Sequence, residues 1–131
     1  MTTLRRSLPT PTLFLAILLA LLWVVPSAHA ASDAVATMAR IVSDMHHYPS
    51  DSQKETLADI SQNQNLSEAT RTLADVIQHI EHQPSEEGIA RLESVLADPE
   101  ATEAEKTLAD VVMRFKHKAG PGSQEMLDKL K

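Results

Sequence analysis

The chain has 131 residues, no cysteine and a formal net charge of −6. Without cysteine it cannot form a disulfide. The acidic balance argues against nucleic acid and anionic lipid as main partners, because both carry negative charge themselves.

Residues 1–30 have the pattern of a secretory signal peptide. Arg5 and Arg6 precede an unbroken apolar run of 13 residues over 13–25, and residues 28–30 read Ala-His-Ala, the small-x-small pattern that signal peptidases cut. The run is shorter than the roughly 20 residues that span a bilayer. No cysteine follows it that could carry a lipid. We therefore predict cleavage after Ala30, export to the periplasm and no membrane attachment of the mature chain.

A 35-residue repeat organises the rest of the chain, residues 31–131, which has the length of a single domain. Residues 67–84 and 102–119 are identical at 8 of 18 positions without a gap, and the same offset carried backwards reaches residues 32–49. A fixed period of this size is typical of stacked supersecondary units. The sequence predicts three helix-turn-helix units, over residues 32–66, 67–101 and 102–131.

Each unit is predicted to contain two helices. Ser32, Ser67 and Thr102 stand before acidic residues and are expected to cap the first helices, while Pro49 and Pro84 are expected to close the first two of them. Shorter apolar patterns follow as second helices. Within the first helices, apolar residues recur at spacings of three and four and predict one buried face. These residues are Val35, Met38, Val42 and Met45; Ala69, Leu73, Ile77 and Ile80; and Ala104, Leu108, Val112 and Phe115.

The fold class predicted from these patterns is all-α. No segment alternates with the period of two that marks a strand. Ala39, Ala74 and Ala109 occupy one equivalent position, where a small side chain lets neighbouring helices approach closely. Two architectures remain open: a short α-solenoid, or a compact helical bundle in which the three units close on themselves.

The chain resembles the tetratricopeptide family of helical hairpin repeats. Its Leu73-Ala74 and Leu108-Ala109 pairs stand where that family has Leu-Gly, and residues 87–99 resemble its second helix and terminal proline. Thr70 and Glu105 stand at positions where the family has aromatic residues. The resemblance implies a right-handed stack of helix pairs whose concave face holds a peptide or a partner protein.

The histidines are the residues best suited to distinctive chemistry. One metal-site hypothesis pairs His79 with His82, one helical turn apart, joined by His46 or Glu81 from a neighbouring unit. Zinc or copper would be the ion, and Met45 beside His46 and His47 would suit copper. The candidate metal ligands are therefore His46, His47, His79 and His82.

His117 is not part of that predicted ligand set. His47, His82 and His117 share one repeat position, and linear stacking would hold them about 10 Å apart, too far to share one ion. The alternative for the five histidines of residues 31–131 is a structural one. Placed in the last turns of the first helices, they would cap carbonyl groups and complement the helix dipole.

Catalytic motifs are absent from the sequence. It contains no cysteine, no Gly-x-Ser-x-Gly, no phosphate-binding glycine loop and no His-Glu-x-x-His. We therefore predict an exported, non-catalytic helical repeat protein without an obligatory cofactor, which binds a protein or peptide as an adaptor, inhibitor or chaperone-like factor. The alternative is a periplasmic metal-binding or metal-stress protein. Self-association through exposed repeat ends is a third alternative.

Overall fold

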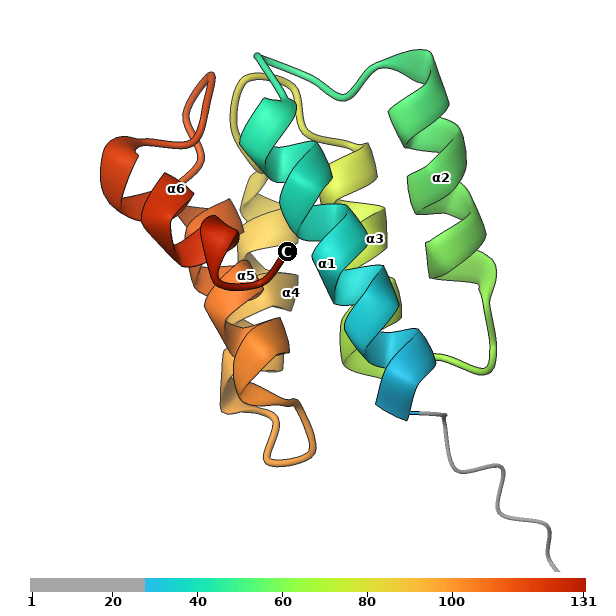
Figure 1. Cartoon of the computed structure of the whole chain (residues 1–131). Coiled ribbons are helices and arrows are strands. Elements are labelled where there is room, and N and C mark those ends of the chain that lie inside the picture. Colours follow the sequence, from blue (N-terminus) through green and yellow to red (C-terminus); the bar gives the residue numbers. More distant parts are fainter. Residues whose placement is uncertain (1–27) are drawn as a thin grey trace, which may run out of the picture.

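The computed structural model describes residues 28–131, and this part of the chain folds into six α-helices (Figure 1). Most of the predicted signal peptide, residues 1–27, lies outside the described residues. None of the six helices combines the length and the apolar character needed to cross a bilayer. The helices are α1 (Ala28–Asp44), α2 (Asp51–Gln62), α3 (Glu68–Gln78), α4 (Glu86–Ala97), α5 (Glu103–Met113) and α6 (Pro121–Asp128).

The helix bounds repeat with the period of the sequence. The second helices α2, α4 and α6 begin at Asp51, Glu86 and Pro121, which are 35 residues apart, and α3 and α5 begin at Glu68 and Glu103. All six elements are helical, as the absence of strand-like alternation predicted.

Two of the three predicted N-caps, Ser67 and Thr102, are present, and serines also cap the second helices α2 and α4. The side chains of Ser50, Ser67, Ser85 and Thr102 each accept a hydrogen bond from the backbone three residues later. The first helix is an exception, since α1 begins at Ala28 rather than after Ser32. Residues 28–31 are alanine-rich, and alanine has the highest intrinsic helix propensity, so the helix continues past the serine.

The first helices end earlier than the prolines indicated. α1 ends at Asp44 and α3 at Gln78, five and six residues before Pro49 and Pro84. The residues between each helix end and its proline form a tight turn instead of continuing the helix. Four of the five histidines of residues 31–131 therefore lie beyond the helix ends, in these turns or in the equivalent turn after α5. The expectation that they occupy the last turns of the first helices was wrong. These four are His46, His47, His82 and His117.

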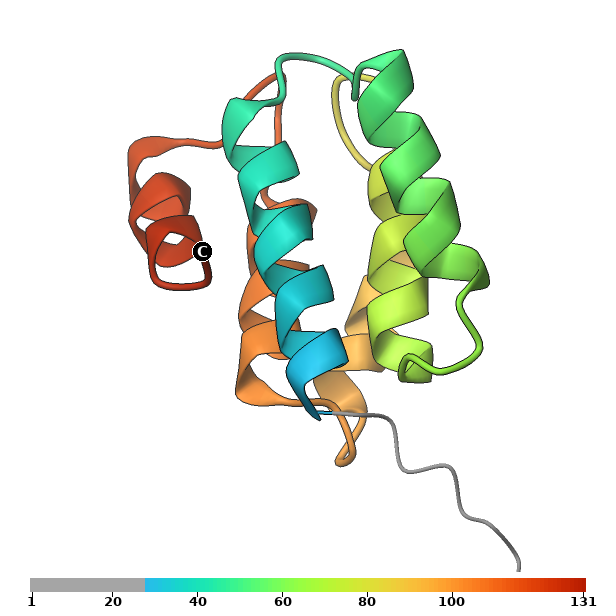
Figure 2. The ribbon, with the colours of Figure 1, turned by 45° about the vertical axis from the view of Figure 1, so that its right-hand side comes forward.

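The first helices build the centre of the molecule. α1, α3 and α5 contact one another in all three pairings, and their predicted apolar stripes are buried, with Ala104 partly so. Ala39, Ala74 and Ala109 have no exposed surface. Each second helix lies against two inner helices: α2 against α1 and α3, α4 against α3 and α5, and α6 against α5 and α1. The two ribbon views show this inner trio with the second helices around it (Figures 1 and 2).

The last unit closes onto the first. Gln124 on α6 accepts a hydrogen bond from the Ser43 hydroxyl at 2.7 Å and donates one to the Ser43 carbonyl at 3.0 Å. The Lys131 ammonium donates to the same hydroxyl at 2.8 Å. Of the two predicted architectures, the structure is therefore the compact, closed bundle. Closure brings together the three turns that follow α1, α3 and α5, and they gather at one end of the molecule (Figure 1).

Candidate metal centre

Three tight turns with one pattern of burial form the candidate site. Each consists of three exposed residues between two buried ones, and the central exposed residue is a histidine in every case. Burial of the flanking residues fixes where each turn leaves and re-enters the core, so the histidine is held at the surface. The turns are Met45 to Pro49 with His47 at the centre, Ile80 to Pro84 with His82, and Phe115 to Ala119 with His117.

All three central histidines have a left-handed backbone. Their φ angles are 69° at His47, 68° at His82 and 62° at His117, and these are the non-glycine residues of the described chain with positive φ. The N–H of Tyr48 donates to the carbonyl of His46 at 2.8 Å across the first turn, so His47 is the central residue of a γ-turn. A non-glycine residue at positive φ costs about 1–3 kcal/mol of backbone strain. Glycine, asparagine or aspartate would adopt this conformation with less strain.

A closed ring of backbone hydrogen bonds joins the three turns. The N–H of His82 donates to the carbonyl of His47, that of His117 to His82, and that of His47 to His117, each at 2.6 Å. Every member is both donor and acceptor, so the ring satisfies three amides and three carbonyls at once. It fixes the three backbones relative to one another and brings the imidazoles to a common point.

The imidazoles lie edge to face around that point. Ring centroids are 5.1 Å apart for His47 and His82, and 5.2 Å apart for each ring with His117. The two Nδ1 atoms of His82 and His117 are 3.3 Å apart. One nitrogen from each ring can be chosen so that all three lie within 4.8 Å of one another. We call His47, His82 and His117 the three-histidine cluster.

The separation between His82 and His117 suits a single transition-metal ion, and a nitrogen as far as 4.8 Å from the others would have to move closer to share it. Two nitrogens bound tetrahedrally to zinc at about 2.0–2.1 Å lie about 3.3 Å from each other, the separation already present between His82 and His117. Imidazole is a favoured ligand of Zn²⁺, Cu²⁺ and Ni²⁺. All three histidines are exposed, so a fourth coordination position would face solvent. The arrangement can therefore bind a metal ion and leave one position for an exchangeable ligand.

The structure brings together only part of the predicted ligand set. His47 and His82 belong to the cluster, whereas His46 lies outside it. His79 is the C-cap of α3 and its ring donates to the Asp75 carbonyl at 2.8 Å, which is the capping role proposed as the alternative.

His117 is the member of the cluster that sequence reasoning missed. The expected spacing of about 10 Å was wrong, because it assumed a linear stack in which equivalent turns follow one another at helix packing distances. In a closed ring the equivalent turns converge instead. The signal that could have identified the cluster was the recurrence of one histidine at the same position in all three units, combined with the closed architecture.

A second polar group lies at the other end of the inner helices. The Glu105 carboxylate is buried and accepts hydrogen bonds from the hydroxyls of Ser67 and Thr70, both at 2.5 Å, and from the Thr102 amide and hydroxyl. Burial raises the pKa of this carboxyl, but the hydrogen bonds from Ser67, Thr70 and Thr102 outweigh it and the net shift is downward. The group joins the N-termini of α3 and α5, and its oxygens are occupied, so its role is structural.

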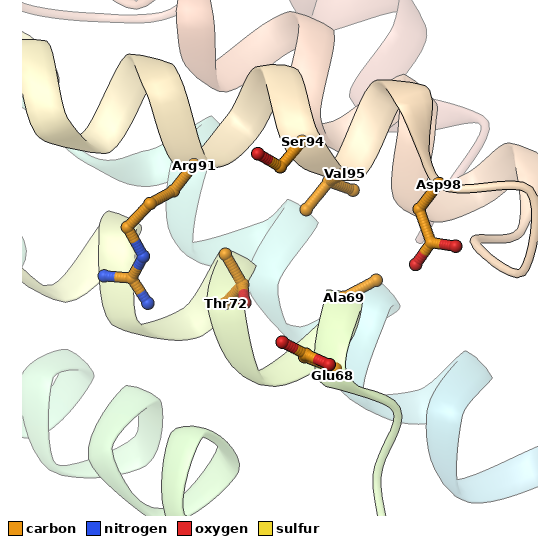
Figure 3. Close-up of a pocket in the computed structure, with 7 residues that line it drawn as sticks. All are labelled: Glu68, Ala69, Thr72, Arg91, Ser94, Val95 and Asp98. Atoms are coloured by element: carbon orange, nitrogen blue, oxygen red, sulfur yellow. The ribbon is translucent and has the colours of Figure 1, made fainter.

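A surface groove follows the outer side of α3. One section, of about 290 Å³, lies between α3 and α4 and includes Glu68, Thr72, Arg91 and Asp98 (Figure 3). Two further sections share Arg91 with it and continue past Asp75. Arg91 forms an ion pair with Asp75, which offsets its charge. The lining also includes Arg71 and His79, so the groove combines four acids with two arginines and with small polar and apolar side chains.

No protein family, curated protein or solved structure matches this chain. The resemblance to tetratricopeptide proteins stays a prediction, and the functional argument rests on the geometry of the described residues.

Proposed function

We propose that this protein binds one divalent transition-metal ion, Zn²⁺ or Cu²⁺, through His47, His82 and His117. The observation that carries the proposal is the combination of backbone and side-chain geometry. Three histidines occupy left-handed positions where glycine would be less strained, and their rings nevertheless meet within 4.8 Å. Backbone strain repeated three times at one surface point is better explained by a need for the imidazoles than by a need for the turns.

The exposure of the cluster favours capture and release of the ion over catalysis. The cluster forms part of an open surface, whereas catalytic metals are usually set in a concave pocket that positions the substrate. Export, inferred from residues 1–30, would place this function in the periplasm. The protein thus fits a metal-buffering or metal-carrying role outside the cytoplasm.

Zinc titration against a competing chromogenic chelator tests this proposal. We expect one ion per chain, and His82→Ala or His117→Ala should weaken binding by at least about a hundredfold. His46→Ala and His79→Ala are the matched controls, because both histidines are exposed and neither belongs to the cluster; they should bind like the parent protein. Equal losses in all four variants, or binding unaffected by any of them, would refute the site.

Binding of a peptide is the second candidate function, and the groove along α3 favours it. Beyond the Asp75–Arg91 pair, its connected sections hold Glu68, Glu87 and Asp98 against Arg71, and this acidic excess complements a lysine-rich extended peptide (Figure 3). A labelled oligolysine peptide is a suitable probe. Glu68→Gln with Asp98→Asn should weaken its binding, whereas His82→Ala should leave it unchanged. Unaltered peptide affinity in the double variant would contradict this role.

A further inference from the structure

We infer that the three-histidine cluster, once it holds a metal ion, binds a small anion as the fourth ligand. This inference rests on the proposed metal site and specifies what occupies its open position. Three neutral imidazoles supply no negative charge, so the bound dication keeps its full charge. Because the histidines are exposed, a water molecule or a dissolved anion can reach the fourth position without any movement of the fold.

The charge around the cluster favours an anion over water. The nine exposed residues at the three turns include two lysines, Lys116 and Lys118, and one acid, Glu81, so their formal charge is 2 − 1 = +1. The whole chain, in contrast, has a formal charge of −6. With a dication added, the three turns themselves carry a formal charge of about +3, which attracts and retains anions although exposed acids such as Asp44, Asp51 and Glu86 lie next to the turns in the chain.

The two lysines stand on either side of a metal ligand. Lys116 and Lys118 flank His117, and the Lys118 N–H donates to the Lys116 carbonyl at 2.7 Å, which closes the turn between them. Ion pairs in the described part of the chain involve His79, Arg91, Arg114, Lys129 and Lys131 as the positive partners. The ammonium groups of the two lysines therefore keep their charge available, and their flexible four-carbon stems allow them to approach a ligand beside His117.

The expected ligand class follows from this arrangement. A suitable anion binds the metal through one atom and accepts hydrogen bonds from the lysine ammonium groups through its other atoms. A carboxylate or an inorganic oxyanion can do both. The exchange is a simple substitution, in which the anion's lone pair replaces that of the coordinated water and the water leaves to solvent. No bond within the anion is broken.

Cobalt-substituted protein provides the test, because the visible spectrum of Co²⁺ reports its coordination. Co²⁺ is first titrated into the full chain to establish that the metal binds, and azide is then added as the anionic probe, with free imidazole as a neutral comparator. We expect azide to change the spectrum saturably. Lys116→Ala and Lys118→Ala should each weaken azide binding about threefold, which is the effect of one charge several ångströms away in a solvated site. Neither should alter imidazole binding.

Lys106→Ala is the matched control, since Lys106 lies in the first turns of α5, at the opposite end of that helix from His117. A spectrum that azide leaves unchanged while Co²⁺ is bound would overturn this inference and leave the metal site standing. Lysine variants that weaken azide and imidazole equally would also overturn it, because charge would not then be the cause. Failure of Co²⁺ to bind would remove the inference together with the proposed function.

Discussion

The backbone N–H of His82 donates a 2.6 Å hydrogen bond to the carbonyl of His47, although the two residues are 35 positions apart and both have a positive φ. This contact joins two turns through the residues whose side chains form the candidate site. Any change that separates the turns must therefore also separate the three imidazoles, and metal binding as proposed would be energetically coupled to the fold.

Metal binding should stabilise the fold. At a free zinc concentration of about 100 times Kd, the added free energy of unfolding is about 2.7 kcal/mol, and Tm should rise by about 10 °C or more. Thermal unfolding followed by circular dichroism, with zinc and with a chelator, measures the difference. The rise should vanish in His117→Ala and persist in His46→Ala; a Tm that zinc leaves unmoved in the parent protein would contradict the site.

His82→Gly separates the structural role of the turn from its ligand role. Glycine adopts positive φ without strain, so the metal-free variant should retain its stability within about 1 kcal/mol, while it loses metal binding. His82→Val should destabilise the protein by more than that, because a β-branched residue is strained in this conformation. Urea unfolding of both metal-free variants provides the comparison. A strongly destabilised glycine variant would show that the imidazole itself supports the fold.

Mild acid should release the metal. The imidazoles bind metal in their neutral form, so protons compete with the ion for the same nitrogens. Zinc affinity should fall steeply between about pH 7.5 and about pH 5.5, and by more than the single-proton competition expected of one ligand. Chelator competition at a series of pH values measures this. An affinity that stays constant over the range would point to carboxylate ligands instead.

Glu105 should contribute stability that is lost in acid, at a lower pH than the one that releases the metal. Its pKa in the folded protein is lowered from the ordinary value of 4.5, so the folded state binds the proton less readily than the unfolded state. The contribution is therefore fully present above pH 4.5 and is lost as pH falls through the folded-state pKa. Glu105→Gln should lower the free energy of unfolding at neutral pH by about 1–3 kcal/mol and flatten its decrease in acid. Urea titrations of both proteins at several pH values test this, and parallel curves would contradict it.

The sequence was sufficient to predict most of the local structure. The apolar spacing from Leu73 to Ile80 and its counterparts identified the buried helix faces, and Ser67 and Thr102 marked helix starts, because periodicity and capping depend on neighbouring residues. The helix ends were less predictable. Pro49 and Pro84 mark the ends of the first two exposed turns rather than the ends of the helices.

The candidate site could be predicted only in part, for a physical reason. His47, His82 and His117 are separated by 35 residues each, and their distance in space depends on whether the units stack openly or close. Closure depends on contacts such as those of Gln124 with Ser43, which join the two ends of the domain and leave no periodic trace in the sequence. The positive φ at each histidine is likewise a property of the closed backbone ring.

The division of the ligands among three units sets an order of events for the whole protein. A chain that has folded only through α4 contains His47 and His82. It lacks His117, whose imidazole completes the cluster and whose backbone N–H and carbonyl complete the hydrogen-bonded ring. The proposed site is thus complete only when α5 and α6 have docked. If the protein is exported as we propose, the extended chain would carry no ion through the export channel and would bind metal only in the compartment where it folds.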